Sequence, residues 1–257
     1  MAEAAGTTKT VEAVVEVGKG RHVGLGRRLL SNRRVVIGGS VLLFFVLVAL
    51  FAPLIAPHDP VEQDLMLQYI PPFWAEKAEA GYLFGTDNLG RDILSRLIYG
   101  TQVALFVAVA AAFAAGALGT TLGLLAGYFG GWVDTVISRL VDIWMAFPAV
   151  LLSIVLVAVM GTGLHSVIIA IAVIDWTRFC RVVRAETMAQ KEQDYVASAV
   201  TIGLGRMRIL WREILPNVLP LLIVLFTLEM GIAIIVEAIL SYVNLSISSD
   251  FPTWGSM

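Results

Sequence analysis

Long apolar runs separated by short polar segments organise this sequence, a pattern typical of a chain that crosses a membrane several times. A hydrocarbon core about 30 Å thick needs roughly 20 apolar helical residues to cross. Five runs meet this requirement, at residues 35–56, 103–129, 143–160, 165–183 and 218–242. The fourth is the weakest, because Asp175, Arg178 and Arg181 interrupt its end. The pattern therefore predicts an all-α bundle of five transmembrane helices.

Composition agrees with this prediction, since 58% of the 257 residues are hydrophobic and 15% are charged. The net charge of −2 and the clustering of basic residues beside apolar runs argue against nucleic-acid binding. Residues 1–34 are too polar and too long to precede the apolar part of a cleaved signal peptide. We expect them to form a basic tail with a disordered start, and residues 35–56 to remain as a membrane anchor.

Basic residues beside the predicted spans give an orientation. The first span follows Arg27, Arg28, Arg33 and Arg34, which place the N-terminus in the cytoplasm. Counting crossings places the loop over 184–216 there too, and this loop carries Arg184, Lys191, Arg206, Arg208 and Arg212. The loop over 57–100 then lies outside, where acidic residues outnumber Lys77. We expect a core domain over residues 101–257.

Two features within the spans predict details of packing. Gly119, Gly123 and Gly127 recur at every fourth position, which places them on one helix face and lets a neighbouring backbone approach closely. Pro148 lies near the start of the third run, where it removes a backbone donor and favours a kink.

Residues 194–217, called the hairpin below, carry the signals of two short helices. Asp194 suits the N-cap of the first helix, and we expect Val196, Ala199 and Val200 to share one face of it. The hairpin either only connects two spans or presents small apolar side chains to a groove in a partner.

The boundaries of the hairpin helices have their own signals. Gly203 can end the first helix in the left-handed region of backbone conformation. Pro216 restricts the end of the second. The sequence therefore predicts a short helix, a tight turn and another short helix under the membrane.

Glu229 and Glu237 lie inside the fifth run, where an ionised side chain is costly and should face the bundle interior, water or a partner. The helical repeat turns both to about the same side. Two roles are open for them. They belong to the solute path or a subunit contact, or they are helix-packing carboxylates that are protonated or hydrogen-bonded.

Motifs for catalysis are missing from the sequence. It has no Gly-rich phosphate loop ending in Gly-Lys-Ser or Gly-Lys-Thr, no His-Glu-x-x-His and no Gly-x-Ser-x-Gly. The three histidines are scattered, and the lone Cys180 cannot form an internal disulfide. We expect no enzyme activity, no metal and no cofactor in this chain.

The hairpin resembles the cytoplasmic loop of binding-protein-dependent ABC importer permeases. Their pattern is Glu-Ala-Ala, three residues, Gly, nine residues, Ile, one residue and Leu-Pro. Ala197, Ser198 and Glu213 depart from it, so a salt bridge through the first Glu of the family is absent here. The run Asp194-Tyr195-Val196 resembles the peptide-importer branch. The resemblance implies an ATPase-coupling site at Asp194, Tyr195, Val196, Ala197, Ser198, Ala199, Gly203, Leu215, Pro216 and Asn217.

Residues 84–100 are similar to the stretch before the second span of dipeptide, oligopeptide and nickel importer permeases. Asp92 and Arg96 are four residues apart with the acid first, the better order for a helix pair. This segment, with Asp87 and Arg91, either caps the outer end of a helix or contacts a solute-delivering partner.

These resemblances imply the type I ABC importer permease fold, with a permease core over 101–257 in a bacterial inner membrane. They imply a second homologous permease, two ABC ATPase subunits that hold ATP and Mg, and an extracytoplasmic solute-binding protein. The implied function is half of the translocation pathway for di- or oligopeptides, with glutathione and nickel complexes also open. The alternative is a proton-coupled secondary transporter that uses Glu229 and Glu237.

The end of the sequence raises one further expectation. The family continues from a Trp-Gly-Ser-Met run like residues 254–257 into a sixth helix, and this sequence stops there. Five of the family's six spans are therefore expected, in a protein that is naturally short or a sequence that is truncated.

Overall fold

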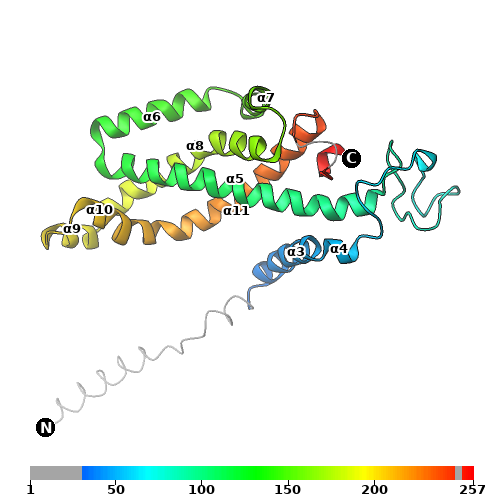
Figure 1. The fold of residues 1–257 in the computed structure, drawn as a ribbon. Coiled ribbons are helices and arrows are strands. Elements are labelled where there is room, and N and C mark those ends of the chain that lie inside the picture. The colour runs from blue at the N-terminus through cyan, green and yellow to red at the C-terminus, as the bar shows by residue number, and fades with distance from the viewer. Residues whose placement is uncertain (1–30, 247–250) are drawn as a thin grey trace, which may run out of the picture. The chain divides into compact units, whose positions relative to one another are not determined.

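Helices make up nearly all the regular structure in the computed structural model, which describes residues 31–246 and 251–257 (Figure 1). The longer helices are α3 (Arg33–Leu50), α5 (Ile93–Phe129), α6 (Gly131–Met145), α7 (Ala149–Met160), α8 (Leu164–Lys191) and α11 (Leu215–Tyr242). The shorter ones are α4 (Ala52–Ile55), α9 (Asp194–Thr201) and α10 (Arg206–Ile209). The predicted all-α class is confirmed. Most of the predicted tail over 1–34, including Arg27 and Arg28, lies outside the described residues.

The chain divides into two units, one ending at Leu47 and the other running from Val48 to Met257. The run predicted as the first span forms α3 and then α4. The break between them falls at Phe51, because Pro53 in the first turn of α4 has no amide hydrogen to continue α3. All the packing described below lies within the second unit.

α5 and α8 run in the same direction and pack through the three glycines of α5. A Cβ added at Gly123 would lie 2.7 Å from the Cys180 carbonyl oxygen, and one at Gly127 would lie 2.7 Å from that of Arg184. The backbone of α8 therefore lies directly on this face, and the predicted close approach is confirmed. Lipid gives helices no hydrophobic drive to associate, so small residues that allow tight packing hold the pair together.

α11 and α7 complete the core around this pair. Buried small and branched apolar residues of the four helices meet there. Its members are Val107, Ala108 and Ala111 of α5, Val157 of α7, Val167, Ala170 and Ile171 of α8, and Ala233 and Leu240 of α11.

The third predicted span, over 143–160, is not one straight helix. α6 ends at Met145, α7 begins at Ala149, and the two axes meet at 88°. Pro148 is the N-cap of α7 and has an extended backbone, which its missing amide hydrogen and fixed φ favour. The predicted kink is therefore confirmed, and a crossing by the bent pair stays a prediction.

By length and composition, three helical stretches among the described residues could cross a membrane, and the bent pair α6 and α7 could form one more. The three are Arg33–Leu50, Ile93–Phe129 and Arg206–Tyr242. α8 contains the predicted fourth span but carries Asp175, Arg178 and Arg181 within its apolar part. That fourth crossing therefore stays a prediction.

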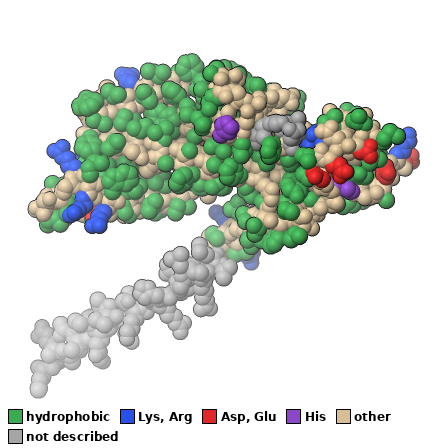
Figure 2. Space-filling model, in the orientation of Figure 1, with side chains coloured by type: hydrophobic (Ala, Val, Ile, Leu, Met, Phe, Trp, Pro, Cys, Tyr) green, Lys and Arg blue, Asp and Glu red, His purple; other side chains and the backbone are tan. Residues whose placement is uncertain are grey.

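The second unit has two ends that differ in charge. At the loop end, residues 57–92 lie near the C-terminal residues 251–257, and at the hairpin end α9 and α10 follow α8 (Figure 1). Lys and Arg gather at the hairpin end, and Asp and Glu gather at the loop end (Figure 2). The exposed basic residues of the hairpin end include Lys191, Arg206, Arg208 and Arg212.

The glycine face generates a stability prediction. Gly123→Val should lower the free energy of unfolding by about 2 kcal/mol or more, because the new side chain would overlap the α8 backbone. The measurement is the thermal unfolding midpoint of the purified protein in detergent.

Gly231→Ala on α11 is the matched control, because a Cβ there meets no atom within 4 Å. It should leave stability unchanged or raise it, since Ala favours a helix over Gly. A Gly123→Val midpoint equal to that of Gly231→Ala would contradict the packing described for α5 and α8.

Candidate functional site

The first helix of the hairpin begins one residue earlier than predicted. Gln193, with an extended backbone, is the N-cap, and its carbonyl oxygen accepts from the amides of Val196 and Ala197 at 3.0 and 3.2 Å. Asp194 lies instead in the first turn of α9, where its negative charge favours the helix dipole. The N-cap prediction for Asp194 was wrong, and the helix itself is present.

One face of α9 is anchored to its own chain. Val196 and Ala199 are buried in a cluster with Leu124 of α5 and Val183 of α8. Val200 was predicted on this face but is 57% exposed. At 100° per residue it lies a quarter turn beyond Ala199, which carries it out of the cluster.

Gly203 ends α9 as predicted. Its φ of +81° is in the left-handed region, where a residue with a Cβ is strained. The amide of Leu204 donates to the Ala199 carbonyl at 3.1 Å, and the amide of Gly203 donates to the Val200 carbonyl at 3.0 Å. These paired bonds satisfy the last carbonyls of α9 and fix the turn.

The second helix of the hairpin is not separate. α10 passes through a π-helical turn, Leu210–Ile214, into α11, and Pro216 lies in the first turn of α11. The amide of Leu215 donates to the Leu210 carbonyl five residues back. This wider turn accommodates a proline that has no amide hydrogen and whose ring would crowd the carbonyl four residues back. Pro216 therefore does not end a helix here.

The other predicted hairpin residues lie mostly at the surface. Asp194, Ala197, Ser198, Pro216 and Asn217 are exposed, and Tyr195 and Leu215 are half-buried. Tyr195 donates from its hydroxyl to Gln190 Oε1 at 2.8 Å, which ties α9 to the end of α8.

An apolar patch remains uncovered beside the turn. Ile202 is 76% exposed, and Val200 and Met207 are also exposed. Basic side chains at 206 and 208 flank it. An exposed apolar patch rimmed by charge is typical of a surface that binds another protein.

At the loop end, Asp92 is the N-cap of α5. Its Oδ2 accepts from the Ser95 amide at 2.9 Å and from the Ser95 hydroxyl at 2.6 Å, and His58 Nδ1 lies 3.6 Å from it. α5 therefore starts at Ile93, and the predicted loop over 57–100 ends eight residues earlier than expected.

Arg96 is fully buried and does not form the predicted pair with Asp92. Its guanidinium lies 3.7 Å from Asp87, donates to the Pro60 carbonyl at 3.3 Å and donates to the Ser256 hydroxyl at 3.2 Å. It joins the loop and the C-terminal segment to α5. The turns at Gly85 and Gly90, both with positive φ, bring Asp87 within reach of it.

Asp87 organises the loop around itself. Its carboxylate accepts from the amides of Leu89 and Arg91 at 2.8 and 3.0 Å and from Arg91 Nε at 2.7 Å. Burial raises the pKa of this carboxyl, but these hydrogen bonds outweigh burial, so its pKa is lowered from the ordinary value. Arg91, Asp92 and Arg96 are all buried, which favours the helix-capping interpretation of this segment.

The two glutamates of α11 are buried, which is one of the three environments expected for them, but their surroundings differ. Glu229 accepts from Arg178 Nη1 of α8 at 3.3 Å, and the same nitrogen lies 3.8 Å from Asp175. Glu237 accepts from the hydroxyls of Ser241 and Ser246 at 2.6 and 3.3 Å. Glu237 is thus a hydrogen-bonded packing carboxylate, and Glu229 belongs to a charged cluster.

Sequence reasoning missed the ion pairs that link helices, of which two are close. One joins Arg178 to Glu229, and the other joins Arg184 of α8 to Asp134 of α6, where Nη2 lies 2.7 Å from Oδ2. Each charge is visible in the sequence, but its partner is about fifty positions away, so no local pattern pairs them.

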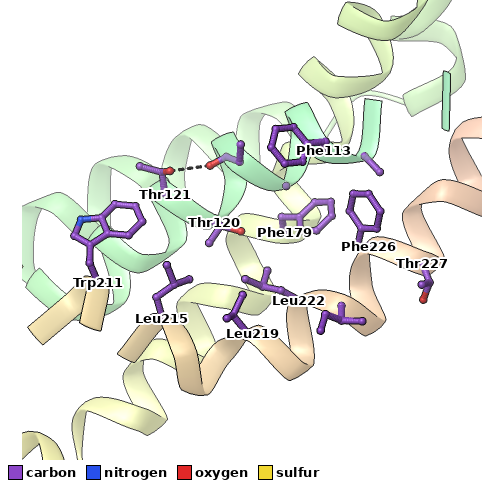
Figure 3. A pocket seen from close by; sticks show the side chains of 14 residues that line it. Phe113, Thr120, Thr121, Phe179, Trp211, Leu215, Leu219, Leu222, Phe226 and Thr227 are labelled. Carbon is purple, nitrogen blue, oxygen red and sulfur yellow. Dashed lines mark hydrogen bonds between the residues drawn. The ribbon is translucent and has the colours of Figure 1, made fainter. Parts of the chain in front are cut away.

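An apolar groove of about 550 Å³ lies between α5, α8 and α11 (Figure 3). Phe113, Phe179, Trp211 and Phe226 line it. The Thr121 hydroxyl there donates to the Ala117 carbonyl of its own helix. Such a lining suits hydrocarbon and gives no counter-charge to a charged solute. Nowhere in residues 31–246 and 251–257 do three His, Cys, Asp or Glu residues gather as a metal site.

Comparison with known families gives two matches. The family described as "Binding-protein-dependent transport system inner membrane component" matches residues 119–253. The family described as "N-terminal TM domain of oligopeptide transport permease C" matches residues 25–72. The first match covers the glycine face, the hairpin and both glutamates of α11.

Individual relatives extend this similarity to most of the chain. The dipeptide transport system permease protein DppC of Haemophilus influenzae is 41% identical over 227 residues, which cover 88% of this chain and 77% of the relative. The di/tripeptide permease protein DppC of Pseudomonas aeruginosa is 38% identical over 88% of this chain and 75% of the relative. The glutathione permease protein GsiD of Escherichia coli is 39% identical, and the match covers 90% of this chain and 75% of the relative.

A solved structure shares the fold. A chain of the inward-facing MetNI methionine ABC transporter superposes with a TM-score of 0.53 at 18% identity, covering 63% of this chain and 77% of that chain. This likeness supports the predicted helical permease fold.

The lowered pKa of Asp87 generates a prediction about pH. A carboxyl with a lowered folded-state pKa stabilises the protein fully above its ordinary pKa, and this contribution is lost as pH falls through the folded-state pKa. Asp87→Asn should reduce the free energy of unfolding by roughly 2 kcal/mol at neutral pH, because charge-assisted hydrogen bonds are lost.

The measurement is the thermal unfolding midpoint of both proteins in detergent from about pH 6 down to about pH 3. The difference between the two unfolding midpoints should become smaller as pH falls. A gap that stays constant over this range would show that the Asp87 charge does not stabilise the loop.

Proposed function

This chain belongs to the family of binding-protein-dependent transport system inner membrane components, and we propose that it is a permease subunit of an ATP-driven importer of small peptides. It is a multi-pass inner-membrane protein of the ABC importer class. The relatives named for dipeptides, di- and tripeptides and glutathione support a peptide solute.

The observation that carries the proposal is the form of the hairpin. Val196 and Ala199 fix α9 to its own bundle, while Val200, Ile202 and Met207 remain uncovered beside basic residues. A surface that is rigidly attached to the bundle and apolar at its tip can bind a partner and transmit the partner's movement to the helices. We propose that a separate ATPase subunit, which itself binds ATP and Mg, binds this patch.

The orientation follows from the same proposal. Basic residues gather at the hairpin end, and acidic residues gather at the loop end (Figure 2). Because basic residues favour the cytoplasmic side, the hairpin and the N-terminus lie in the cytoplasm. The loop end then faces an extracytoplasmic solute-binding protein.

A second permease completes the pathway in this proposal. α11 has many exposed apolar residues along its length, including Leu219, Ile223, Leu228 and Ile235. Lipid and a homologous permease subunit cover them in the assembled importer. The proton-coupled alternative gains no support from the relatives, which are components of binding-protein-dependent systems or peptide permeases.

Ile202→Asp tests the contact with the ATPase. The side chain is exposed, so the fold should persist, but a charge in the apolar patch should weaken ATPase binding at least about tenfold. Co-purification of the ATPase with the tagged permease gives the measurement.

Leu83→Asp, at an exposed position of the loop end, is the matched control and should leave ATPase binding unchanged. ATPase retention that is equal in the two variants would count against the hairpin as the docking site.

Gly203→Val tests whether the shape of the turn matters. A β-branched residue is strained at a φ of +81°, whereas Asn tolerates this region, so Gly203→Asn serves as the control. Peptide uptake into liposomes by the assembled importer should fall at least about tenfold for Val and only slightly for Asn. Equal uptake by the two variants would rule out the turn geometry as a determinant of coupling.

A further inference from the structure

A small cavity that contains two charged side chains lies between α7, α8 and α11, apart from the apolar groove. Its volume is about 180 Å³, and its lining is aliphatic except for Asp175 and Arg178 of α8. Glu229 of α11 pairs with the same arginine at 3.3 Å. Three charged groups from two helices therefore converge beside one cavity.

This cluster lies near the middle of the bundle. Glu229 is about 20 Å from either end of α11 at 1.5 Å per residue. The Arg178 side chain is nevertheless 37% exposed. A charged side chain at this depth cannot face lipid tails without a large penalty, so the surface of α8 and α11 around Arg178 must face water or protein.

The cluster has an excess of negative charge. Two carboxylates face one guanidinium, which leaves one negative charge uncompensated when all three are ionised. Asp175 is 4% exposed, and its carboxylate accepts no hydrogen bond from the described residues. Its one cationic neighbour among the described residues, Arg178, lies at 3.8 Å, beyond hydrogen-bond distance, while a closer contact holds Arg178 to Glu229.

We propose that the Asp175 cavity is a binding subsite for a primary ammonium group of the transported solute, with Asp175 as its carboxylate partner. An ammonium group supplies both the missing positive charge and the hydrogen-bond donors that Asp175 lacks. The cavity is smaller than the roughly 300–1,000 Å³ of pockets that enclose a whole drug-sized ligand, so it accepts one end of the solute.

This inference rests on the proposed function, because the solute must pass along the surface that bears Arg178. It assigns that surface to the wall of the pathway. Arg178 holds Glu229 in place and adds a positive charge to the site. This charge limits the affinity for an ammonium group, so the solute can leave. Glu237 takes no part, because Ser241 and Ser246 already donate to it.

The test measures thiol labelling in the assembled importer. In a Cys180→Ala background, Val236→Cys places a thiol on the cavity wall. Labelling rates are compared for aminoethyl methanethiosulfonate, which is cationic, and sulfonatoethyl methanethiosulfonate, which is anionic, each relative to a free thiol in solution. The cationic reagent should react at least about tenfold faster. Asp175→Asn, and independently Glu229→Gln, should each remove most of this preference.

Two peptides probe the site directly. Ala-Ala, with a free ammonium group, should slow labelling at Val236→Cys, and N-acetyl-Ala-Ala at the same concentration should not. Equal relative rates for the two reagents, or equal effects of the two peptides, would overturn the proposed subsite. ATP-driven uptake of Ala-Ala by the wild-type importer is measured in parallel, and its absence would reject the peptide-importer function instead.

Discussion

The close packing of α5 on α8 is the constraint on which the rest of the structure depends. Three glycines leave one face of α5 without side chains over residues 119–127, so the α8 backbone lies directly against it there. In lipid this contact relies on dispersion between well-fitted surfaces, because no hydrophobic drive brings helices together. α8 then carries the mid-bundle charges on one side and Arg184 near its hairpin end. A wider spacing of the two helices would displace all of these groups relative to α11.

Polar groups at the loop end and in the middle of the bundle have different roles. At the loop end, Asp87 binds Arg91 and lies close to Arg96, while Asp92 caps α5, so these charges serve to fix the start of α5. In the middle, Arg178 is shared between two carboxylates and stays partly exposed. The first arrangement is structural, although Asp92 Oδ1 and Arg96 Nε have no hydrogen-bond partner among the described residues. The second is incompletely satisfied, which is the state expected of a site that exchanges partners.

The sequence predicts features that depend on local pattern. Apolar runs give the helices, the four-residue spacing gives the glycine face, and Gly203 gives a turn that only a residue without a Cβ adopts easily. Prediction from the sequence fails where the position or partner of a side chain depends on residues from elsewhere in the chain. Val200 has the right period but lies outside the cluster that buries Val196. Arg96 meets Asp87 because two turns fold the loop back, and Arg178 meets Glu229 across 51 positions.

The continuity of α10, the π-helical turn and α11 has a mechanical consequence. Residues 206–242 form a rod about 55 Å long at 1.5 Å per residue, which exceeds the roughly 30 Å hydrocarbon core of a bilayer. The regular hydrogen-bond spacing of this helix changes at Leu210–Ile214, and Pro220 removes one more backbone donor. The helix is therefore easiest to bend or twist between residues 210 and 220, on the hairpin side of Glu229.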